Sequence, residues 1–470
     1  MRILLPTGSA TEATVRAAAA GYDADVVVTG QLASFLTPHK LGQIVQAGKY
    51  DMAIVSGMCT ASFEQVERST GVPVYRGPRH AADLALVLPL LGTVTLSKTV
   101  PADDFLAGKK REEAVRAIRD AEREATADYI IHGLKIGGNS RMKVLAEIMD
   151  AHRRKDIRND VERFFASGAD IVDLGFGFDA TPDDVRRVFD AIADIDRPLS
   201  VDTQDPALIR AALPRADIVL SLQSKNIPVI GKEVDAAGAA AVVVPDDRTL
   251  AQNIALAKKA GVRCIIADPL LQPAGSGFAA SLRNFRKGRY PVFFGAGNVV
   301  ELFDADSVGM NALLAAIAME LGASIIFSSE HSDKTKGAIA EMRKATEMMV
   351  LAKDRPYPKD LGIDLFVLKE KRRRVEPPPG YETVVAAQPA PKEIQYDPKG
   401  SFRIGIEGDE IVAVIHGKAV KGKRWQDIFA AIQKAGDVSL LDHAAYLGRE
   451  LYKAELAIRY GRSFEQDGEL

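Results

Sequence analysis

The sequence predicts an α/β protein built on a (β/α)8 barrel, with a small α/β domain before the barrel and a small α+β domain after it. Between Tyr129 and Ser329, eight short apolar runs alternate with stretches long enough for a helix. Each run ends in polar residues or glycine, which is typical of parallel strands that are buried on both faces. Eight strand and helix pairs in roughly 230 residues match the usual size of such a barrel. A doubly wound open sheet is the structural alternative, because the strand count rests on pattern alone.

Composition indicates a globular protein whose overall charge favours no class of charged partner. The 470 residues are 47% hydrophobic, and 61 Lys plus Arg face 63 Asp plus Glu, for a net charge of -2. This balance provides no overall electrostatic field that would attract nucleic acid or an anionic membrane, so we expect neither as a partner. Cys59 and Cys264 are too few for a disulfide framework, and no stretch of about 18 apolar residues occurs. We therefore expect a cytoplasmic protein that acts on small molecules. We also expect a homo-oligomer, namely a dimer, although composition does not indicate the oligomeric state.

Residues 1–100 alternate short apolar runs with helical patterns, which predicts a Rossmann-like α/β domain. The expected strands are residues 3–6, 24–29, 52–56 and 72–75, with a first helix over 11–20. A Thr-Gly-Ser-Ala-Thr turn at residues 7–11 opens that helix. Its backbone N–H groups can receive an anion at a helix N-terminus, although short glycine turns of this kind more often serve only as connections.

The barrel is predicted over residues 127–355, after a charged helical connector at 106–126. The expected strands are 129–135, 169–175, 198–202, 216–222, 240–245, 263–268, 291–296 and 323–328. The expected helices are 158–167, 182–195, 207–213, 229–237, 248–260, 279–286, 311–321 and 333–353. Because chemistry in such barrels takes place at the carboxyl ends of the strands, the residues there form the candidate site.

Two further segments follow the barrel. Residues 369–394 combine a basic run with several prolines and predict a solvated linker, although the basic run is also able to contact a phosphate. Residues 395–470 predict an α+β domain. It is expected to contain a hairpin of strands 402–406 and 410–415, then helices 424–434 and 441–460. Trp425, at the start of the first of these helices, is expected to anchor packing rather than to bind a ligand.

Three aspartates stand in or at the end of predicted barrel strands. Asp173 lies in an apolar run, where a buried carboxylate requires a partner. Asp202 and Asp268 end the third and sixth strands. A fixed carboxylate accepts paired hydrogen bonds from adjacent N–H donors, such as those of a pterin. An amide or hydroxyl side chain can form hydrogen bonds with the remaining edge of the same ring. Capping of the following helix is the structural alternative. The fourth strand supplies the candidate polar readers Ser221, Gln223 and Asn226.

Three loops have the composition of an anion site. The loop after the first predicted strand combines a glycine pair with Lys135, Asn139 and Arg141. Barrels commonly bind phosphate at the loops after strands seven and eight, with a helix N-terminus. There the candidates are Gly295, Asn298, Asp306, Asn311, Ser328, Ser329, Glu330 and Lys334. No ligand pattern specifies a transition metal, but Mg²⁺ can accompany a diphosphate, and no organic cofactor is expected.

The order Gly168-Ala-Asp-Ile-Val-Asp173-Leu-Gly175, Ser200-Val-Asp202-Thr203 and Asp268-Pro269 resembles the dihydropteroate synthase family. With both flanking domains, the chain more closely resembles the dihydropteroate synthase-like proteins of methanogens and methylotrophs, which belong to tetrahydromethanopterin biosynthesis. The resemblance implies condensation of 6-hydroxymethyl-7,8-dihydropterin diphosphate with 4-(β-D-ribofuranosyl)aminobenzene 5'-phosphate, releasing diphosphate. It also implies that Asp202 and Asp268 contact the pterin, with Ser221 where the family has Asn.

The chain departs from this family at two loops. Gly295-Ala-Gly-Asn298 replaces the family's Ser-Arg-Lys-Ser after strand seven, and Ser329-Glu-His331 replaces its Arg-x-His after strand eight. Positive charge is therefore expected from Lys135, Arg141 and Lys334. The predicted catalytic residues are Asp202, Asp268, Lys135 and Lys334. Two alternatives use the same acids: a pterin-dependent methyltransferase and a non-catalytic pterin-binding subunit.

Overall fold

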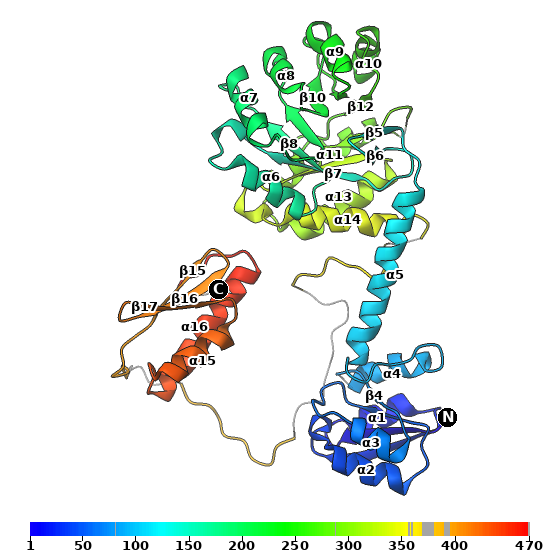
Figure 1. The fold of residues 1–470 in the computed structure, drawn as a ribbon, viewed down its shortest axis with the longest axis vertical. Helices are drawn as coiled ribbons and strands as arrows, with labels where there is room; N and C mark the ends of the chain where they lie inside the picture. Colours follow the sequence, from blue (N-terminus) through cyan, green and yellow to red (C-terminus); the bar gives the residue numbers. More distant parts are fainter. Residues whose placement is uncertain are drawn as a thin grey trace. The chain divides into compact units, whose positions relative to one another are not determined.

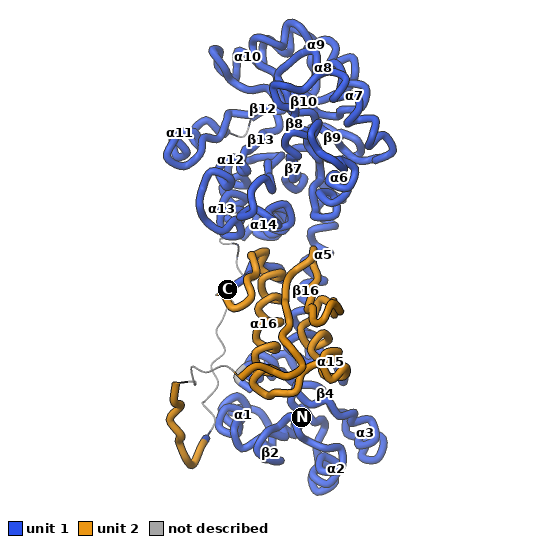
Figure 2. Tube along the Cα trace, turned by 90° about the vertical axis from the view of Figure 1, so that its left-hand side faces the viewer, with its two compact units in different colours: residues 1–380 blue, residues 381–470 orange. Residues whose placement is uncertain are grey.

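The computed structural model describes residues 1–79, 81–286, 288–355, 358, 361–368, 380–389 and 395–468. The chain divides into two compact units, Met1–Gly380 and Tyr381–Leu470, which Figure 2 shows in different colours. The first unit contains two parallel sheets and a long helix between them in the sequence (Figure 1). The second unit contains an antiparallel sheet and two helices. Much of the predicted linker, residues 369–379 and 390–394, lies outside the described residues.

A four-stranded parallel sheet with the order β2-β1-β3-β4 forms the first part of the chain. Its strands are β1 Ile3–Gly8, β2 Ala24–Gly30, β3 Met52–Val55 and β4 Val74–Arg76, so the four predicted strands are confirmed. Helices cover both faces: α1 Glu12–Ala19, α2 Pro38–Ala47, α3 Glu64–Thr70 and α4 Leu84–Val87. Because side chains alternate along each strand, neighbours such as Leu4 and Leu5 fill separate cores on opposite faces.

Eight parallel strands form the barrel, in the order β12-β11-β10-β9-β8-β7-β14-β13. They are β7 Lys143–Ile148, β8 Ile171–Gly175, β9 Leu199–Asp202, β10 Ile218–Leu222, β11 Ala240–Val243, β12 Ile265–Ala267, β13 Phe293–Phe294 and β14 Ile325–Ser329. A parallel bridge between Ala267 and Val292 joins the two end strands. The strands therefore close on themselves, which confirms the predicted (β/α)8 barrel and excludes an open sheet.

The helices of the barrel alternate with its strands in the sequence, the last of them following β14, and pack against the outer face of the strands. They are α6 Ile157–Ala166, α7 Pro182–Ala191, α8 Pro206–Ala212, α9 Ile227–Ala236, α10 Leu250–Lys259, α11 Phe278–Ser281, α12 Ala296–Glu301, α13 Ser307–Glu320 and α14 Ala338–Ala352. Helices α7 and α10 begin with reciprocal capping boxes at Thr181 and Thr249, and Asp205 accepts a hydrogen bond from Ala207 N at the start of α8. Asp205 is thus a helix cap, as its place before Pro206 indicates.

The predicted first barrel strand, residues 129–135, is wrong. This segment forms a two-stranded antiparallel hairpin of β5 Tyr129–Ile131 and β6 Leu134–Ile136. His132 and Gly133 both have positive φ, as a two-residue hairpin turn requires. Ile131 and Ile136 pack with the inward-facing strand residues of the barrel. The true first strand is β7, in which Lys143 and Glu147 interrupt the apolar run.

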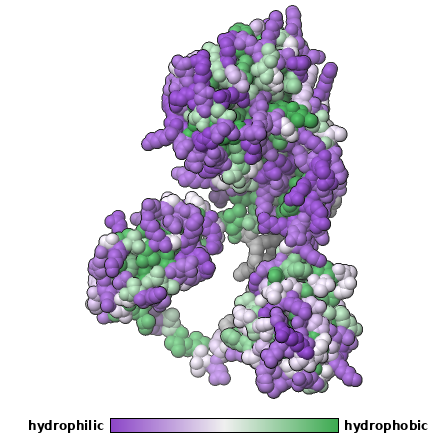
Figure 3. Space-filling model, in the orientation of Figure 1, coloured by the Kyte–Doolittle hydropathy of each residue, from purple (hydrophilic) through white to green (hydrophobic). Residues whose placement is uncertain are grey.

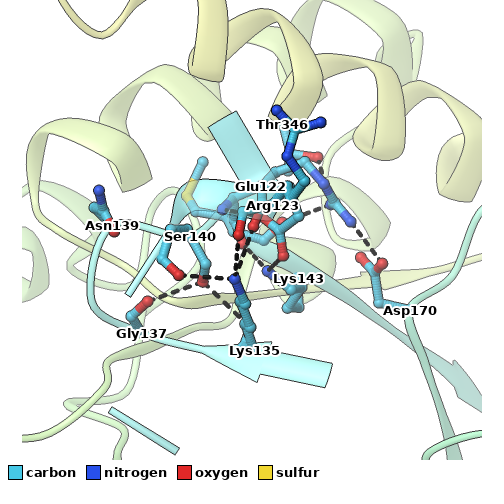
Figure 4. A network of polar contacts seen from close by, with 12 residues as sticks. Glu122, Arg123, Lys135, Gly137, Asn139, Ser140, Lys143, Asp170 and Thr346 are labelled. Atoms are coloured by element: carbon cyan, nitrogen blue, oxygen red, sulfur yellow. Dashed lines mark hydrogen bonds and ion pairs between the residues drawn. The ribbon is translucent and has the colours of Figure 1, made fainter. Parts of the chain in front are cut away.

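A network of ion pairs surrounds the amino ends of β7 and β8 (Figure 4). Lys143 is fully buried, and its Nζ lies 3.0 Å from Oε1 of Glu122 on helix α5, Ala102–Glu124. Asp170, just before β8, accepts from Arg141 Nη2 at 2.6 Å and from Arg343 Nη1 at 2.9 Å. Each buried charge here has an opposite charge beside it, which is the condition for tolerating charge away from water.

The second unit folds around its own apolar core. Strands β15 Arg403–Glu407, β16 Glu410–Ile415 and β17 Lys418–Gly422 form an antiparallel sheet that packs on α15 Trp425–Ala435 and α16 Leu441–Arg459. The predicted hairpin and both helices are confirmed, and β17 is an additional strand. Trp425 packs against Phe429 and Tyr452, as expected for a packing anchor.

One face of the molecule is largely polar. On the face shown in Figure 3, hydrophilic side chains cover most of the surface of each part. None of the helices in the described part of the chain is both long and apolar enough to span a membrane.

Candidate functional site

Three carboxylates meet at the carboxyl end of the barrel. Glu147 on β7, Asp173 on β8 and Asp202 at the end of β9 each place an oxygen within 4.8 Å of the others. Strand register explains this, because Glu147 pairs with Asp173, and Gly175 pairs with Asp202. Glu147 and Asp173 stand two residues after Leu145 and Ile171, which face the barrel interior, so they face inward as well.

The three acids stand close together. Among the described residues, no ion pair joins a Lys, Arg or His to Glu147, Asp173 or Asp202, although Ser200 Oγ donates to Asp173 Oδ1 at 2.5 Å. Asp173 Oδ2 is buried without a hydrogen-bond partner. Burial, with Asp202 nearby, raises the pKa of Glu147 to about 7, and burial raises the pKa of Asp202 to about 6. Burial and the two neighbouring acids also raise the pKa of Asp173 well above its usual value. The cluster therefore requires protons, a cation or a ligand with N–H donors.

Asp268 is a fourth acid at the same end of the barrel. It follows β12, and its Oδ1 accepts from Leu270 N at 2.8 Å. Its side chain is buried, and this burial raises its pKa to about 7. In the sheet, β10 and β11 separate β9 from β12, so Asp202 and Asp268 project from separate strands. Both acids lie at the strand ends where they were predicted.

The polar residues after β10 hold one another in place. Asn226 Nδ2 donates to Ser221 O at 3.0 Å, and its Oδ1 accepts from Gln223 N at 2.8 Å. Gln223 Nε2 donates to Gln204 Oε1, in the loop after β9. Asn226 therefore supports the backbone of this loop, and Ser221 stands at the strand end as predicted.

The predicted phosphate loop after β14 already surrounds a carboxylate of the protein. Glu301, the last residue of α12, accepts from Ser329 Oγ at 3.0 Å, His331 N at 2.8 Å, Ser332 Oγ at 2.6 Å and Thr335 Oγ1 at 2.7 Å. Burial alone raises the pKa of Glu301, but these donors outweigh burial and leave the pKa below its usual value. The anion-binding character of the loop was recognised correctly, but its anion is a side chain.

Lys334 and the other residues around this corner have structural partners. Lys334 Nζ donates to Phe303 O at 2.8 Å and lies 3.2 Å from Asp304 Oδ1. Asp306 occupies the N-cap of α13, and Asn311 Nδ2 donates to Glu341 Oε2. Glu330 pairs with Arg163 and accepts from Ile339 N. Asn311 and Glu330 thus contact residues of the outer helices, and their contact with substrate stays a prediction.

The glycine loop after β13 is closely packed. A Cβ on Gly297 would lie 2.6 Å from the ring of Phe327, so this helix can approach β14 only without a side chain there. Gly295 and Asn298 lie beside each other, with Asn298 Nδ2 3.6 Å from the position of a Cβ on Gly295. Ser328 is buried in the last part of β14. These residues shape the corner, and none of Gly295, Gly297, Asn298 and Ser328 carries a charge.

Lys135, Asn139 and Arg141 lie at the amino end of the barrel strands, so their predicted place in the site is wrong (Figure 4). Lys135 Nζ donates to the carbonyls of Glu122, Arg123 and Ala125 at the end of α5, which suits a cation at a helix C-terminus. Asn139 Oδ1 accepts from Thr126 N and Oγ1. Arg141 pairs with Asp170. The error follows from taking the hairpin for the first barrel strand.

The sequence analysis missed two features of the site. Glu147 was missed because its strand was not recognised. His152, after β7, has a buried side chain that stacks on Phe176, and neither ring nitrogen makes a hydrogen bond, although Nε2 lies 3.4 Å from Asp179 Oδ1. His152 is followed by Arg153, Arg154 and Lys155, which brings positive charge to the carboxyl end of β7. The run Asp150–Lys155 was a detectable signal for this loop.

Comparisons with known proteins found similar solved structures and a matching family model. Among solved structures, the chain is similar to Yersinia pestis dihydropteroate synthase with a pterine-sulfa conjugate, at 19% identity, 45% coverage of this chain, 94% of that chain and a TM-score of 0.38. It is also similar to Burkholderia cenocepacia dihydropteroate synthase complexed with 7,8-dihydropteroate, at 18% identity and a TM-score of 0.40. This match covers 49% of this chain and 97% of that chain. Residues 396–467 match the family described as PterinBD-DUF4346.

One curated relative matches along the full chain. It is the Methanocaldococcus jannaschii protein called "Uncharacterized protein MJ0107", which is 35% identical over 520 aligned positions covering 100% of this chain and 99% of the relative. Identity at this level over both complete lengths includes the N-terminal sheet and the second unit as well as the barrel. The chain therefore belongs to the same family as this Methanocaldococcus jannaschii protein.

Proposed function

We propose that this protein is a dihydropteroate synthase-like transferase. It condenses 6-hydroxymethyl-7,8-dihydropterin diphosphate with an arylamine, which we take to be 4-(β-D-ribofuranosyl)aminobenzene 5'-phosphate, in tetrahydromethanopterin biosynthesis. The observation that carries the proposal is the set of four acids at the carboxyl end of the barrel, Glu147, Asp173, Asp202 and Asp268. Asp173 and Asp268 are buried, and the other two are half-buried. The description of the family that matches residues 396–467 supports pterin as the ligand.

Asp202 and Asp268 recognise the pterin in this proposal. Each side chain is held at a strand end, and each carries a pKa raised by burial to about 6 and about 7. Ring N–H and amino groups of a pterin donate to carboxylates, which compensates for the loss of water. Binding therefore favours the ionised acids, and pterin affinity should rise as the pH rises through this range.

Glu147 and Asp173 are the residues that would hold Mg²⁺ beside the pterin. Carboxylate oxygens are the donors that Mg²⁺ prefers, and Asp173 Oδ2 is a buried oxygen without a hydrogen-bond partner. When bound, the ion would offset the charge of the acid cluster and of the diphosphate. The fit rests on the type and spacing of the donors, which lie within 4.8 Å of one another.

The reaction itself requires positioning rather than a nucleophilic side chain. The amine nitrogen forms a bond to the exocyclic methylene carbon of the pterin, and the bond between that carbon and the diphosphate oxygen breaks. Diphosphate leaves with the electron pair, and the amine loses one proton to solvent. Holding the two substrates in line provides the main rate advantage, and positive charge near the leaving group adds to it.

The basic loop after β7 is the proposed source of that positive charge. The corner after β14 already contains the Glu301 carboxylate, whereas the loop after β7 presents Arg154 and Lys155 together with His152. Arg153 is paired with Asp179, so Arg154 and Lys155 are the cations that we assign to a phosphate group. Arg154→Gln should raise the KM of the phosphorylated substrates several-fold, with little change in melting temperature.

The experiment that tests the proposed function is a turnover assay with both substrates. Asp202→Asn should lower kcat/KM by roughly a hundredfold or more. The control Asp247→Asn changes an exposed aspartate in the loop after β11 and should leave kcat/KM unchanged. Product formation by Asp202→Asn at the wild-type rate would contradict the assignment. Calorimetry with dihydropterin and diphosphate measures binding separately.

A non-catalytic pterin-binding subunit is the second candidate. It is favoured by the corner after β14, where Glu301 occupies the hydroxyl and N–H donors and where the family's lysine and arginine are replaced. Saturable pterin binding without any product, under conditions in which the protein is folded, would establish this alternative.

A further inference from the structure

The N-terminal sheet has a hollow of its own, outside the barrel site. The hollow has a volume of about 390 Å³ and lies at the carboxyl ends of β1 and β3, bordered by the loops after β2 and β4. In the order β2-β1-β3-β4, β2 is added on one side of β1, whereas β3 and β4 are added on the other side. The point where the strand order reverses therefore lies between β1 and β3. In open parallel sheets, ligands bind at this position, because the loops separate there and leave a crevice. The volume falls in the range of small-molecule sites.

Both apolar and polar side chains line this hollow. The apolar ones belong to the core that packs on α1 and include Leu5, Val15 and Ile54. Around them stand hydroxyl groups, including those of Thr7, Thr11, Ser34 and Ser56. Thr7 Oγ1 and Thr11 Oγ1 are 2.9 Å apart, so one hydroxyl can donate to the other and still accept from a ligand.

Two close backbone contacts hold the loops around the hollow in fixed positions. A Cβ on Gly8 would lie 2.4 Å from Gln31 O, and a Cβ on Gly57 would lie 2.6 Å from Gly77 O. Gly57 N donates to Pro78 O, and Gly77 N donates to Val55 O. The loops that border the hollow are therefore joined directly by backbone, which produces a preformed site.

The rim of the hollow exposes apolar side chains. Leu32 is 48% exposed and Met58 is 54% exposed, and both line the opening. Phe35, three residues after Leu32, is 77% exposed. Large apolar side chains grouped around a hollow, rather than scattered singly, are typical of a binding site.

The charges at the hollow favour a ligand without net charge. Arg79 is the one charged side chain among the described residues that line it. Its guanidinium group already donates to Asp103 Oδ2 at 2.9 Å and to Asp104 at 2.7 and 2.5 Å, in the first turn of α5. A charged ligand would thus lose water without gaining a free opposite charge.

We propose that this hollow, between the loops of residues 7–11, 31–34, 56–58 and 77–79, binds an uncharged small molecule about the size of a nucleoside. The ligand combines a flat ring, which covers Ile54 and the rim residues Leu32 and Met58, with hydroxyl or amino groups that pair with the threonine and serine hydroxyls. This site is independent of the barrel acids and of the proposed transferase activity.

The test uses the full-length protein and ligand-observed NMR. Adenosine, guanosine and uridine are titrated, with their 5'-monophosphates as charged counterparts. Ala10→Trp places an indole at the opening of the hollow, and the matched control Ala17→Trp places one on the exposed side of α1, away from it. Met58→Ser removes an exposed rim contact with little risk to folding.

We expect saturable binding of at least one nucleoside. Ala10→Trp and Met58→Ser should each weaken its affinity about fivefold or more, and Ala17→Trp should leave the affinity unchanged. Each monophosphate should bind with lower affinity than its nucleoside. Absence of binding by all three nucleosides would overturn the proposal. Equal binding by Ala10→Trp and Ala17→Trp in folded protein, or tighter binding of the monophosphates, would overturn it as well.

Discussion

The two ends of the barrel handle buried charge in opposite ways. At the amino end, Lys143 lies beside Glu122, and Asp170 lies between Arg141 and Arg343. At the carboxyl end, Glu147, Asp173 and Asp202 lie together, and in the described part of the chain none of them forms an ion pair. Paired charges join elements of the fold, whereas unpaired like charges that lie together raise the free energy of the folded protein. Such a cost at a strand end indicates a ligand-binding role, because the ligand can remove it.

The hairpin β5–β6 strengthens this contrast. Ile131 and Ile136 pack against the inward-facing residues and fill the amino end of the barrel with apolar side chains. His132 lies 2.8 Å from Asp196 and 3.3 Å from Asp217, which fixes the turn of the hairpin against the segments before β9 and β10. One end of the barrel is therefore closed and paired, and the chemistry is assigned to the other.

The largest expected effect on stability comes from the amino end. Asp170→Asn should lower the free energy of unfolding by about 3–5 kcal/mol, because it leaves Arg141 buried without its charge partner. Denaturant unfolding measures this value. Glu233→Gln, which breaks the exposed pair of Glu233 with Arg210, is the control and should change it by less than about 1 kcal/mol. Equal effects of the two substitutions would show that the amino-end network is not a structural element.

The carboxyl end should behave in the opposite way. Asp202→Asn should lower kcat/KM for the proposed reaction by roughly a hundredfold or more, since it removes charge-assisted hydrogen bonds to the pterin. Its melting temperature should stay the same or rise, because one of three neighbouring acids has lost its charge. A marked loss of stability in this variant would place Asp202 with the structural residues and break the comparison.

The pH dependence of the free energy of unfolding tests the buried acid Asp268 at the carboxyl end. The pKa of Asp268 is raised by burial from 3.8 to about 7, so the folded protein holds this proton more tightly than the unfolded chain. The resulting stabilisation is fully present below about pH 4 and is lost as the pH rises to about 7. Asp268→Asn should therefore be more stable than the wild type at pH 8, on the order of 2–4 kcal/mol, and similar to it at pH 4. Thermal or denaturant unfolding at both pH values measures this difference, and equal stability of the two proteins at pH 8 would contradict the raised pKa.

The fold was predicted correctly from the sequence where an uninterrupted apolar run marked each strand. The strands from β8 to β14 were recognised because strands buried on both faces read as apolar runs. β7 was missed since Lys143 and Glu147 interrupt its run, and both charges are explained only by partners distant in the sequence. The preceding hairpin imitates a strand of the expected length. Asp202 and Asp268 were located correctly because a strand end can be recognised locally.

Residues whose role depends on tertiary contacts were harder to predict. The loop from Ser329 to Thr335 has the composition of a phosphate site, and only the fold reveals that Glu301 from α12 supplies the anion. In the same way, Lys135 looks like a free cation in the sequence, but it caps the end of α5. Composition indicates which charge a loop can bind, whereas the source of that charge depends on elements that meet in space.

The smallest effect that we predict is stabilisation by Mg²⁺ at the carboxyl end. If Glu147 and Asp173 hold the ion, Mg²⁺ at ten times its dissociation constant should stabilise the wild type by about 1.4 kcal/mol, which raises the melting temperature by a few degrees. Glu147→Gln removes one donor of the cluster and should lose most of this shift. Glu122→Gln is the control, because Glu122 pairs with Lys143 at the amino end and should keep the full Mg²⁺ response even if its baseline stability falls. An equal Mg²⁺ response in both variants would place the ion away from the acid cluster, and the raised pKa values would then reflect shared protons.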